Sequence, residues 1–210
     1  MTALILWRHG NTDWNAQERI QGHSDTPLNA RGRAQAAEAA KLLAARTPVA
    51  IFSSDLSRCT QTAAPLAELT GLPVRLDTRL RERNYGDWEG LTQADLKQRW
   101  PESYARKRKG ADAADLGHGI ERPADVMKRA GEVLREIAET VRPGATVVVA
   151  THGGTARYGM FELLGWPADQ LGSLAALINC HYSELRHSPD RGWTLYAHNL
   201  GTAEGQPGYE

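Results

Sequence analysis

Residues 4–10 read LILWRHG, and this stretch decides how the rest of the sequence is interpreted. Its apolar half, residues 4–7, has the length and the unbroken hydrophobicity of a strand that is buried on both faces of a sheet. Arg8 and His9 follow at the point where that strand is expected to end. Because ligands bind beyond the carboxyl ends of strands in open α/β sheets, these two side chains are candidates for chemistry.

The same arrangement, an apolar run followed by polar residues, occurs twice more along the chain. Residues 49–58 read VAIFSSDLSR, and residues 146–154 read TVVVATHGG. If the three strands are parallel, their ends lie at one edge of the sheet. The side chains that would then share one crevice are Arg8, His9, Arg58 and His152.

Helical patterns occupy the intervals between these runs, which is typical of an α/β fold with right-handed crossovers. Two further runs, 177–186 and 192–198, surround the turn sequence SPDRG and predict an antiparallel hairpin. We therefore predict a three-layer α/β/α sandwich with a mostly parallel central sheet, one antiparallel edge strand, and a polar, irregular excursion at 97–120 over the candidate active site. The predicted helices are 29–46, 57–70, 123–141 and 155–164.

The composition is that of an ordinary globular protein, with 41% hydrophobic and 24% charged residues among 210. Lys plus Arg and Asp plus Glu are both 25, so the net charge is zero and nucleic acid is disfavoured as a partner. The two cysteines are too few for a disulfide scaffold or a four-thiolate metal site. No apolar run approaches the ~20 residues of a membrane span, and the first residues do not resemble a signal peptide. We expect one domain, residues 1–210, in the cytoplasm.

Two arginines and two histidines in one crevice make an anion-binding pocket. Guanidinium groups match phosphate oxygens bidentately, and a helix that begins after Gly154 adds the positive end of its dipole. Phosphoryl transfer also needs a nucleophile and a proton donor. A histidine such as His9 can carry a phosphoryl group covalently, and a carboxyl group can protonate the leaving oxygen. Glu82, within RLRERNYG at residues 79–86, is the candidate for that carboxyl group.

On these residues the chain resembles the histidine phosphatase superfamily, on its cofactor-dependent phosphoglycerate mutase-like branch. The Arg-His-Gly motif of that family matches residues 8–10, and the pattern WN…QG..D.PLN..G..QA matches residues 14–36. The patterns SS.L.R..QTA and L.E…G.WEG match residues 53–63 and 80–90, and the second His-Gly pair matches residues 152–153. Because these motifs occur in the family's order along the chain, the resemblance is specific.

The resemblance implies a role for each matching residue. His9 is the nucleophile that forms phosphohistidine, and Glu82 is the general acid and then the base for the attacking water. The residues implied to clamp the phosphoryl oxygens are Arg8, Arg58 and His152. Secondary phosphate or substrate contacts are implied for Asn15, Gln21, Gly22 and Gly153. No metal or organic cofactor is implied, the expected partner is a small phosphorylated metabolite, and a homodimer is common among relatives.

The same residues serve phosphatases and mutases of this family, so the activity is decided by the surrounding sequence. The family's mutases carry a longer excursion after the acidic residue, with an Arg-Arg-Ser-Tyr segment and a proline run, and residues 91–120 lack both. They also usually carry Asn after the second His-Gly pair, where this chain has Gly154. Residues 119–126, GIERPADV, resemble the phosphatase pattern GGESxxDV, with departures at Ile120 and Arg122. We therefore favour a phosphatase.

Two alternatives stay open. A 2,3-bisphosphoglycerate-dependent phosphoglycerate mutase would interconvert phosphoglycerates when primed with the bisphosphate. A silent phospho-ligand binding domain is the other, although all the core residues that such a domain would lose are present. The simplest interpretation of the basic stretch at residues 97–109 is a solvated helix face. A further hypothesis is that its residues 106–109 contact a second anionic group of the substrate.

Overall fold

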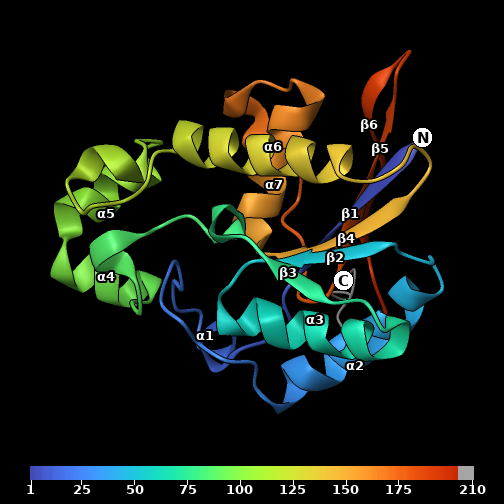
Figure 1. Cartoon of the computed structure of the whole chain (residues 1–210). Helices are drawn as coiled ribbons and strands as arrows, with labels where there is room; N and C mark the ends of the chain where they lie inside the picture. The colour runs from blue at the N-terminus through green and yellow to red at the C-terminus, as the bar shows by residue number, and fades with distance from the viewer. Residues whose placement is uncertain (203–210) are drawn as a thin grey trace.

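The computed structural model describes residues 1–202, and residues 203–210 of the predicted domain lie outside the described residues. At its centre is a six-stranded sheet with the order β3-β2-β4-β1-β5-β6 (Figure 1). The strands are β1 (Thr2–Arg8), β2 (Ala50–Ser53), β3 (Val74–Leu76), β4 (Thr146–Thr151), β5 (Tyr182–Ser188) and β6 (Gly192–Leu200).

Four neighbouring strands of the sheet are parallel. β4 pairs in parallel with both β1 and β2, and β2 pairs in parallel with β3. β5 is antiparallel to β1, and β6 is antiparallel to β5. The strand that runs against all the others is therefore β5, and it lies one position in from the edge that β6 forms. Since Trp7 and Ser53 both lie opposite Ala150, the polar residues that follow all three strands share one edge of the sheet.

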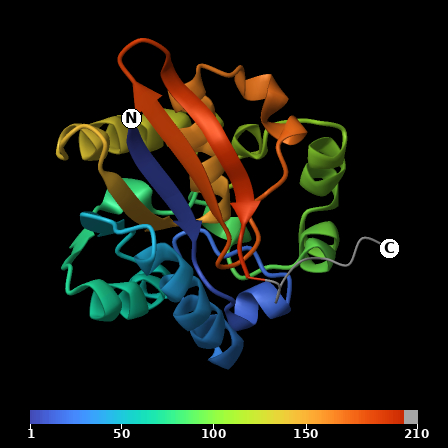
Figure 2. The same ribbon diagram turned by 90° about the vertical axis from the view of Figure 1, so that its right-hand side faces the viewer.

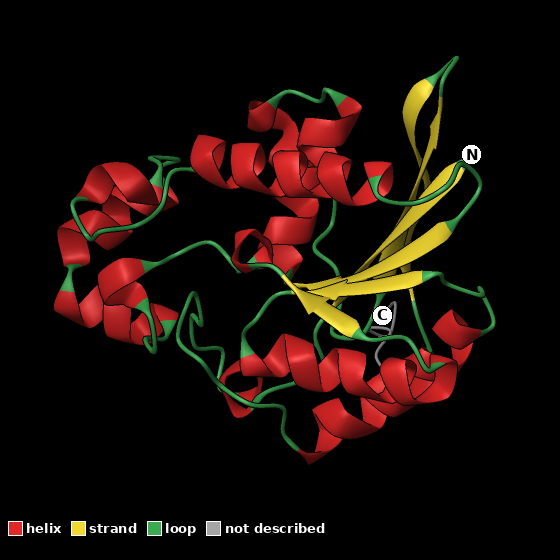
Figure 3. Cartoon of the chain, in the orientation of Figure 1, coloured by secondary structure: helices red, strands yellow, loops and turns green. Residues whose placement is uncertain are grey.

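Helices cover both faces of the sheet, which confirms the predicted three-layer sandwich (Figures 1 and 3). Leu4 and Leu6 pack into the core on the side of α6 (Pro123–Glu139) and α7 (Gly153–Leu164). Ile5 and Trp7 pack into the core on the opposite side. A strand with partners on both faces needs apolar residues at every position, which is why residues 4–7 show no alternation. The helices on the second face are α2 (Ala30–Ala44) and α3 (Ser57–Thr70).

The predicted excursion is more regular than its sequence indicates. It forms α4 (Gln93–Arg99), α5 (Pro101–Arg108) and a 3-10 turn, η3 (Ala113–Leu116), so the expectation of irregular backbone is wrong. These elements share a small core of their own, built around Trp88, Leu96 and Ile120. In Figure 1 they stand to the left of the sheet, toward the carboxyl ends of the parallel strands. The shorter elements are α1 (Asp13–Ala16), η1 (Thr78–Leu80), η2 (Gly86–Trp88) and η4 (Ala168–Ser173).

The predicted hairpin is present, as Figure 2 shows for β5 and β6 in red, but its first strand begins at Tyr182 rather than at residue 177. Residues 177–181 instead run past the end of β1. The backbone N–H of Cys180 donates to the carbonyl oxygens of Arg8 and His9 there. None of the helices within residues 1–202 has the length and apolar character needed to cross a membrane.

Candidate active site

A cavity opens at the carboxyl edge of the sheet, where the polar residues after β1 and β2 converge with Glu82. Seven of the nine predicted site residues line it, together with three residues that the sequence analysis did not single out, Arg19, Ile20 and Tyr85. The predicted residues in the lining are Arg8, His9, Asn15, Gln21, Gly22, Arg58 and Glu82.

The remaining two predicted residues, His152 and Gly153, lie behind the two arginines of the lining. The ring of His152 accepts a hydrogen bond at Nδ1 from Nε of Arg58, at 3.2 Å. A Cβ atom at Gly153 would lie 3.3 Å from Nε of Arg8, closer than most such contacts. The glycine therefore allows Arg8 to lie against the start of α7.

His9 is held with one ring nitrogen free for attack. It is 3% exposed, and its backbone N–H donates to the carbonyl oxygen of Thr151 at 2.9 Å. Nδ1 lies 2.8 Å from the carbonyl oxygen of Gly10, which can only accept, so Nδ1 carries the proton. Nε2 then keeps its lone pair and is the ring nitrogen that can act as a nucleophile.

The same surroundings keep His9 uncharged. Burial lowers the pKa of His9 well below its usual value, and the positive charges of Arg58 and Arg8 lower it further, against a smaller opposing effect of the Gly10 hydrogen bond. A neutral imidazole is the form that attacks phosphorus, so the nucleophile is available over the neutral pH range.

Arg58 is fully buried and is held by backbone oxygens. Its Nη1 and Nη2 donate to the carbonyl oxygens of Ser24 and Gly22, each at 2.7 Å. Arg8 donates from Nη1 to the carbonyl oxygen of Leu177 at 2.5 Å, whereas its buried Nε has no hydrogen-bond partner among the described residues. Neither guanidinium forms a salt bridge within residues 1–202. Because an unpaired buried charge is costly, two such groups side by side make a strong site for an anion.

His152 is buried beside these groups. Since Arg58 can only donate to Nδ1, the proton of His152 is on Nε2, which donates to Oγ of Ser54 at 2.9 Å. Burial, followed by the charge of Arg58, lowers the pKa of His152 well below its usual value. Its ring centre is 5.2 Å from that of His9. His152 thus orients Arg58 and closes the site behind the nucleophile.

Asn15 and Gln21 have their amide oxygens engaged by the protein. Oδ1 of Asn15 accepts from the backbone N–H of Thr12, and Oε1 of Gln21 accepts from the hydroxyl groups of Thr12 and Thr26. With the oxygens anchored in this way, the amide N–H groups are the ends available to a ligand in the cavity. Donors of this kind suit phosphate oxygens.

Glu82 lines the same cavity as the arginines, at the N-terminus of α7. Its Oε1 accepts from the backbone N–H groups of Arg83 and Thr155, at 2.9 and 3.0 Å, and from the Thr155 hydroxyl. Within residues 1–202, its Oε2 accepts only from the backbone N–H of Gly154, at 3.0 Å. Oε2 is therefore the oxygen with a free lone pair to hold and deliver a proton.

Two residues to which the sequence analysis gave no role, Asn179 and Thr62, form hydrogen bonds with the backbone of His9 and Gly10. Nδ2 of Asn179 donates to the carbonyl oxygens of His9 and Gly10, and the Thr62 hydroxyl accepts from the backbone N–H of Gly10. Asn179 fell in a predicted strand, so no signal marked it. Arg19 and Ile20 had a signal, since they directly precede the predicted Gln21 and Gly22.

The basic stretch at residues 106–109 does not line the cavity. Its most buried member, Lys107, places Nζ 5.1 Å from the centre of the Trp88 ring, and burial lowers the pKa of that amine. The structure thus gives no support to the hypothesis that this stretch contacts the substrate. Across residues 1–202, no group of three His, Cys, Asp or Glu side chains is placed to hold a metal ion.

Replacing Gly154 with alanine should displace the carboxyl group of Glu82. The added Cβ would lie 2.5 Å from Oε1 and 3.1 Å from Cδ of Glu82, so the carboxyl group must move. We expect kcat/KM to fall by about 10- to 100-fold, because a shift of about 1 Å in a reacting group has an effect of this size. The free energy of unfolding should not rise, because the gain that alanine brings by restricting the unfolded chain requires a position where its Cβ fits without strain.

Gly172→Ala is the matched control, because nothing lies within 4 Å of a Cβ atom at Gly172. Steady-state kinetics and chemical denaturation of both variants provide the measurement. Unchanged kinetics in Gly154→Ala would mean that Glu82 does not occupy this position during turnover.

Two of the buried histidines, His9 and His152, predict how stability depends on pH. His9 and His152 are neutral in the folded chain, because burial and then the charge of Arg58 lower the pKa of each below 6.5. In the unfolded chain each takes up a proton near pH 6.5, so below that pH the unfolded state binds more protons. The free energy of unfolding should therefore be greatest above about pH 6.5 and fall below it by about 1.4 kcal/mol per histidine per pH unit.

Urea denaturation in a buffer free of phosphate, at about pH 7.5 and about pH 5.5, measures this loss. His152→Gln should show a pH dependence smaller than that of the unchanged chain by about 1.4 kcal/mol per pH unit, since the contribution of His152 is removed. A free energy of unfolding that is the same at both pH values would contradict neutral, buried histidines.

The chain was compared with known proteins on its sequence and on its structure. Residues 4–200 match the sequence model described as "Histidine phosphatase superfamily (branch 1)". Glucosyl-3-phosphoglycerate phosphatase of Mycobacterium tuberculosis is 39% identical over 189 residues, which cover 87% of this chain and 84% of that protein. Metal-independent phosphoserine phosphatase of Arabidopsis thaliana is 32% identical over 197 residues, or 93% of this chain and 80% of that protein. A solved structure of mycobacterial glucosyl-3-phosphoglycerate phosphatase with VO3 superimposes with a TM-score of 0.86 and 38% identity, over 95% of this chain and 99% of that chain.

Proposed function

Since this chain belongs to the histidine phosphatase superfamily, we propose that it hydrolyses small phosphomonoesters through a phosphohistidine on His9. The observation that carries the proposal is the arrangement of three groups around one cavity. Nε2 of His9 is neutral and unprotonated, the half-buried Arg8 and the buried Arg58 line the same cavity, and so does Glu82.

The first half of the reaction transfers the phosphoryl group to the protein. The phosphate of the substrate lies against Arg8 and Arg58, whose charges stabilise the transition state. Nε2 of His9 forms a bond to phosphorus while the bond from phosphorus to the ester oxygen breaks. Oε2 of Glu82 gives its proton to that oxygen, so the alcohol leaves in neutral form.

The second half returns the protein to its starting state. A water molecule takes the place of the alcohol, and Glu82, now a carboxylate, accepts a proton from it. The water oxygen forms a bond to phosphorus as the bond to Nε2 breaks. Inorganic phosphate leaves, His9 is neutral again, and Glu82 holds a proton for the next turnover.

The other proposed site residues support these steps. We assign contacts with the phosphoryl oxygens to the amide N–H groups of Asn15 and Gln21, whose oxygens accept from the backbone N–H of Thr12 and from the hydroxyl of Thr26, respectively. Gly22 offers its carbonyl oxygen to Arg58. His152 and Gly153 act behind the arginines, by orienting Arg58 and by leaving room for Arg8.

Two relatives suggest which esters to test first. They are named for glucosyl-3-phosphoglycerate and for phosphoserine, and both of these compounds carry a carboxylate near the phosphorylated hydroxyl. We propose substrates of this class. Arg19 lines the cavity, and its only anionic partner within the described residues is Asp95, at 3.6 Å. It is the cation best placed to meet a second acidic group.

Release of phosphate from a panel of small phosphomonoesters tests the proposal, with the purified chain and a chelator present. The panel includes both named compounds and uncharged alkyl phosphates. We expect release to persist with the chelator, because the mechanism uses no metal. We also expect vanadate to inhibit it, because a trigonal-bipyramidal mimic of the phosphoryl group suits a site formed by Arg8 and Arg58. Absence of release, with interconversion of phosphoglycerates once 2,3-bisphosphoglycerate is added, would favour the mutase instead. A single domain over residues 1–210, a cytoplasmic location and a homodimer stay predictions.

A further inference from the structure

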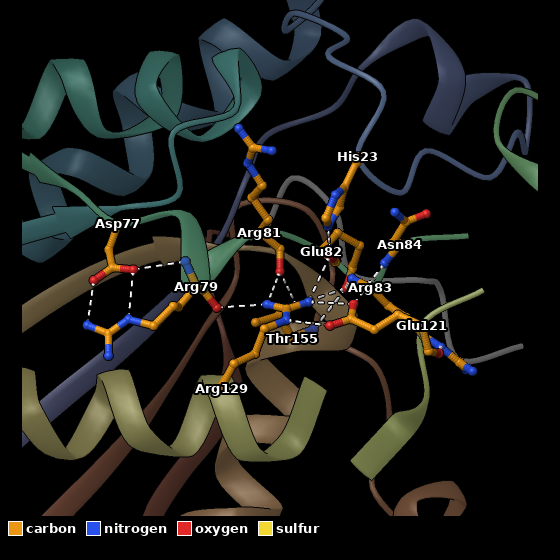
Figure 4. A network of polar contacts seen from close by, with 10 residues as sticks. All are labelled: His23, Asp77, Arg79, Arg81, Glu82, Arg83, Asn84, Glu121, Arg129 and Thr155. Carbon is orange, nitrogen blue, oxygen red and sulfur yellow. Dashed lines mark hydrogen bonds and ion pairs between the residues drawn. The ribbon is translucent and has the colours of Figure 1, made fainter. Parts of the chain in front are cut away.

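The segment that carries Glu82 is held by side chains rather than by a strand or a helix. The carbonyl oxygen of Leu80 accepts from the Thr151 hydroxyl at 2.8 Å, and that of Arg81 accepts from the Thr155 hydroxyl at 2.7 Å. The carbonyl oxygen of Glu82 accepts from Nε2 of His23 at 2.9 Å. One further side chain, Arg129 of α6, donates to three of the four carbonyl groups in residues 79–82 (Figure 4).

Arg129 uses every N–H group of its guanidinium in this contact. Nη1 donates to the carbonyl oxygens of Arg79 and Arg81, each at 2.7 Å, and Nη2 donates to that of Glu82 at 3.0 Å. The remaining two N–H groups, on Nε and Nη2, donate to the two carboxylate oxygens of Glu121 at 2.7 and 2.9 Å. A guanidinium has five donors in a planar fork, and no other side chain can make this set of bonds.

Glu121 extends the contact to the other side of Glu82. Its carboxylate accepts from the backbone N–H of Asn84 at 3.0 Å, and its own backbone N–H donates to the carbonyl oxygen of Asn84 at 2.9 Å. Its carbonyl oxygen accepts from Nε of Arg83. Glu121 follows the excursion directly in sequence, so Arg129 and Glu121 together tie the end of the excursion to residues 79–84.

From this geometry we propose that Arg129 is the positioning residue of the proton donor, acting through the backbone of Glu82. Arg129 contacts the carbonyl oxygen of Glu82 and not its carboxyl group, so it fixes where the side chain begins without competing for the proton. The carboxyl group then reaches the N–H groups of Gly154 and Thr155. The inference rests on the proposed function, because it concerns the step in which Glu82 protonates the leaving oxygen.

The leaving group of the substrate separates this role from a structural one. An alkyl phosphate needs a proton on its departing oxygen, whereas 4-nitrophenyl phosphate releases a stable phenolate and depends little on a proton donor. The measured quantity is kcat/KM, which covers the steps up to formation of phosphohistidine and leaves out the later attack by water. The variant is Arg129→Met. Its matched control is Arg135→Met, on the same helix, where Arg135 instead pairs with Glu162 at 2.9 Å.

We expect Arg129→Met to lower kcat/KM for glycerol phosphate by about 100-fold, the size of effect that a misplaced reacting group produces. For 4-nitrophenyl phosphate the loss should be much smaller, and inhibition by inorganic phosphate should be unchanged. Arg135→Met should leave both esters unaffected. An equal loss on both esters, or no loss on either, overturns the proposal.

A double variant tests whether Arg129→Met lowers kcat/KM by misplacing Glu82. In a chain that already carries Glu82→Gln, Arg129→Met should cause little further loss on glycerol phosphate, because the group that it positions is gone. A full additional loss would mean that Arg129 acts elsewhere.

Two more conservative variants test the same proposal if Arg129→Met does not fold. Arg129→Lys keeps the charge but offers fewer donors, and Glu121→Gln keeps the carbonyl contacts of Arg129 but weakens its anchor. Each should show the same preference for 4-nitrophenyl phosphate over glycerol phosphate, to a smaller degree. If the unchanged chain releases no phosphate from any ester, the proposed function fails. If it is active and these variants show no such preference, only the inference fails.

Discussion

Replacement of His9 with alanine should abolish turnover while the chain still binds inorganic phosphate. The variant lacks the atom that forms the bond to phosphorus, and loss of a covalent nucleophile lowers kcat by about 10⁴-fold or more. The arginines that bind the anion are held by other contacts. Arg58 donates to the carbonyl oxygens of Gly22 and Ser24, and Arg8 donates to that of Leu177. Phosphate binding by calorimetry and turnover by phosphate release are therefore expected to separate.

The phosphoryl intermediate gives a second measurement on the same variant. The reaction is run with an ester whose phosphoryl group is radiolabelled, and it is quenched with alkali. The unchanged chain should then retain a label that acid removes, as expected for phosphohistidine. His9→Ala should retain no label. His187→Ala is the control, since that ring packs against Trp193 in the β5–β6 hairpin, outside the cavity lining. Turnover that survives in His9→Ala would place the nucleophile on another residue.

Replacement of Glu82 with glutamine should slow alkyl phosphates far more than aryl phosphates. The amide occupies the same volume but cannot deliver a proton, and general acid catalysis contributes about 10²- to 10⁴-fold. We therefore expect a loss of that size in kcat/KM for glycerol phosphate and a much smaller one for 4-nitrophenyl phosphate. The limb of the pH profile on which the unchanged chain loses activity as its proton donor ionises should also disappear.

Glu102→Gln provides the control for a change of charge alone, because Glu102 is exposed on α5 and does not line the cavity. Equal losses on the two classes of ester would indicate that Glu82 contributes to binding of the phosphate rather than to protonation. Retention of the full pH profile in Glu82→Gln would assign the proton donor to a different group.

The three strand ends were predictable because each carries a local signal. Residues 4–7 are apolar at every position, as a strand between two helical layers requires, and the polar residues follow at once. The parallel pairing of β1, β2 and β4 then brings Arg8, His9 and Arg58 to one edge. For these residues, the types and their order along the chain are sufficient to predict the site.

The excursion was not predictable in the same way. Its helices are short and highly charged, and their buried apolar contacts come from residues spread along the chain, such as Leu96, Leu116 and Ile120, and from Trp88, which precedes them. The start of β5 was misplaced for a related reason. Residues 177–181 are apolar enough for a strand, yet they turn at the carboxyl end of β1, where Cys180 adopts a φ of 58°. The strand propensity of residues 177–181 is outweighed there by hydrogen bonds with the end of β1, which is distant in sequence.

The sequence by itself predicted the parallel strands and the helices between them, and it singled out His9, the two arginines and Glu82 as candidates for nucleophile, phosphate contacts and proton donor. Only the tertiary structure decided how these groups are held: His152 behind Arg58, Glu82 at the start of α7, and Arg129 across residues 79–82. The physical reason is that the supporting bonds end on backbone carbonyl and N–H groups. Every residue but proline carries both groups, so the identity of a residue does not reveal which distant side chain will reach its backbone.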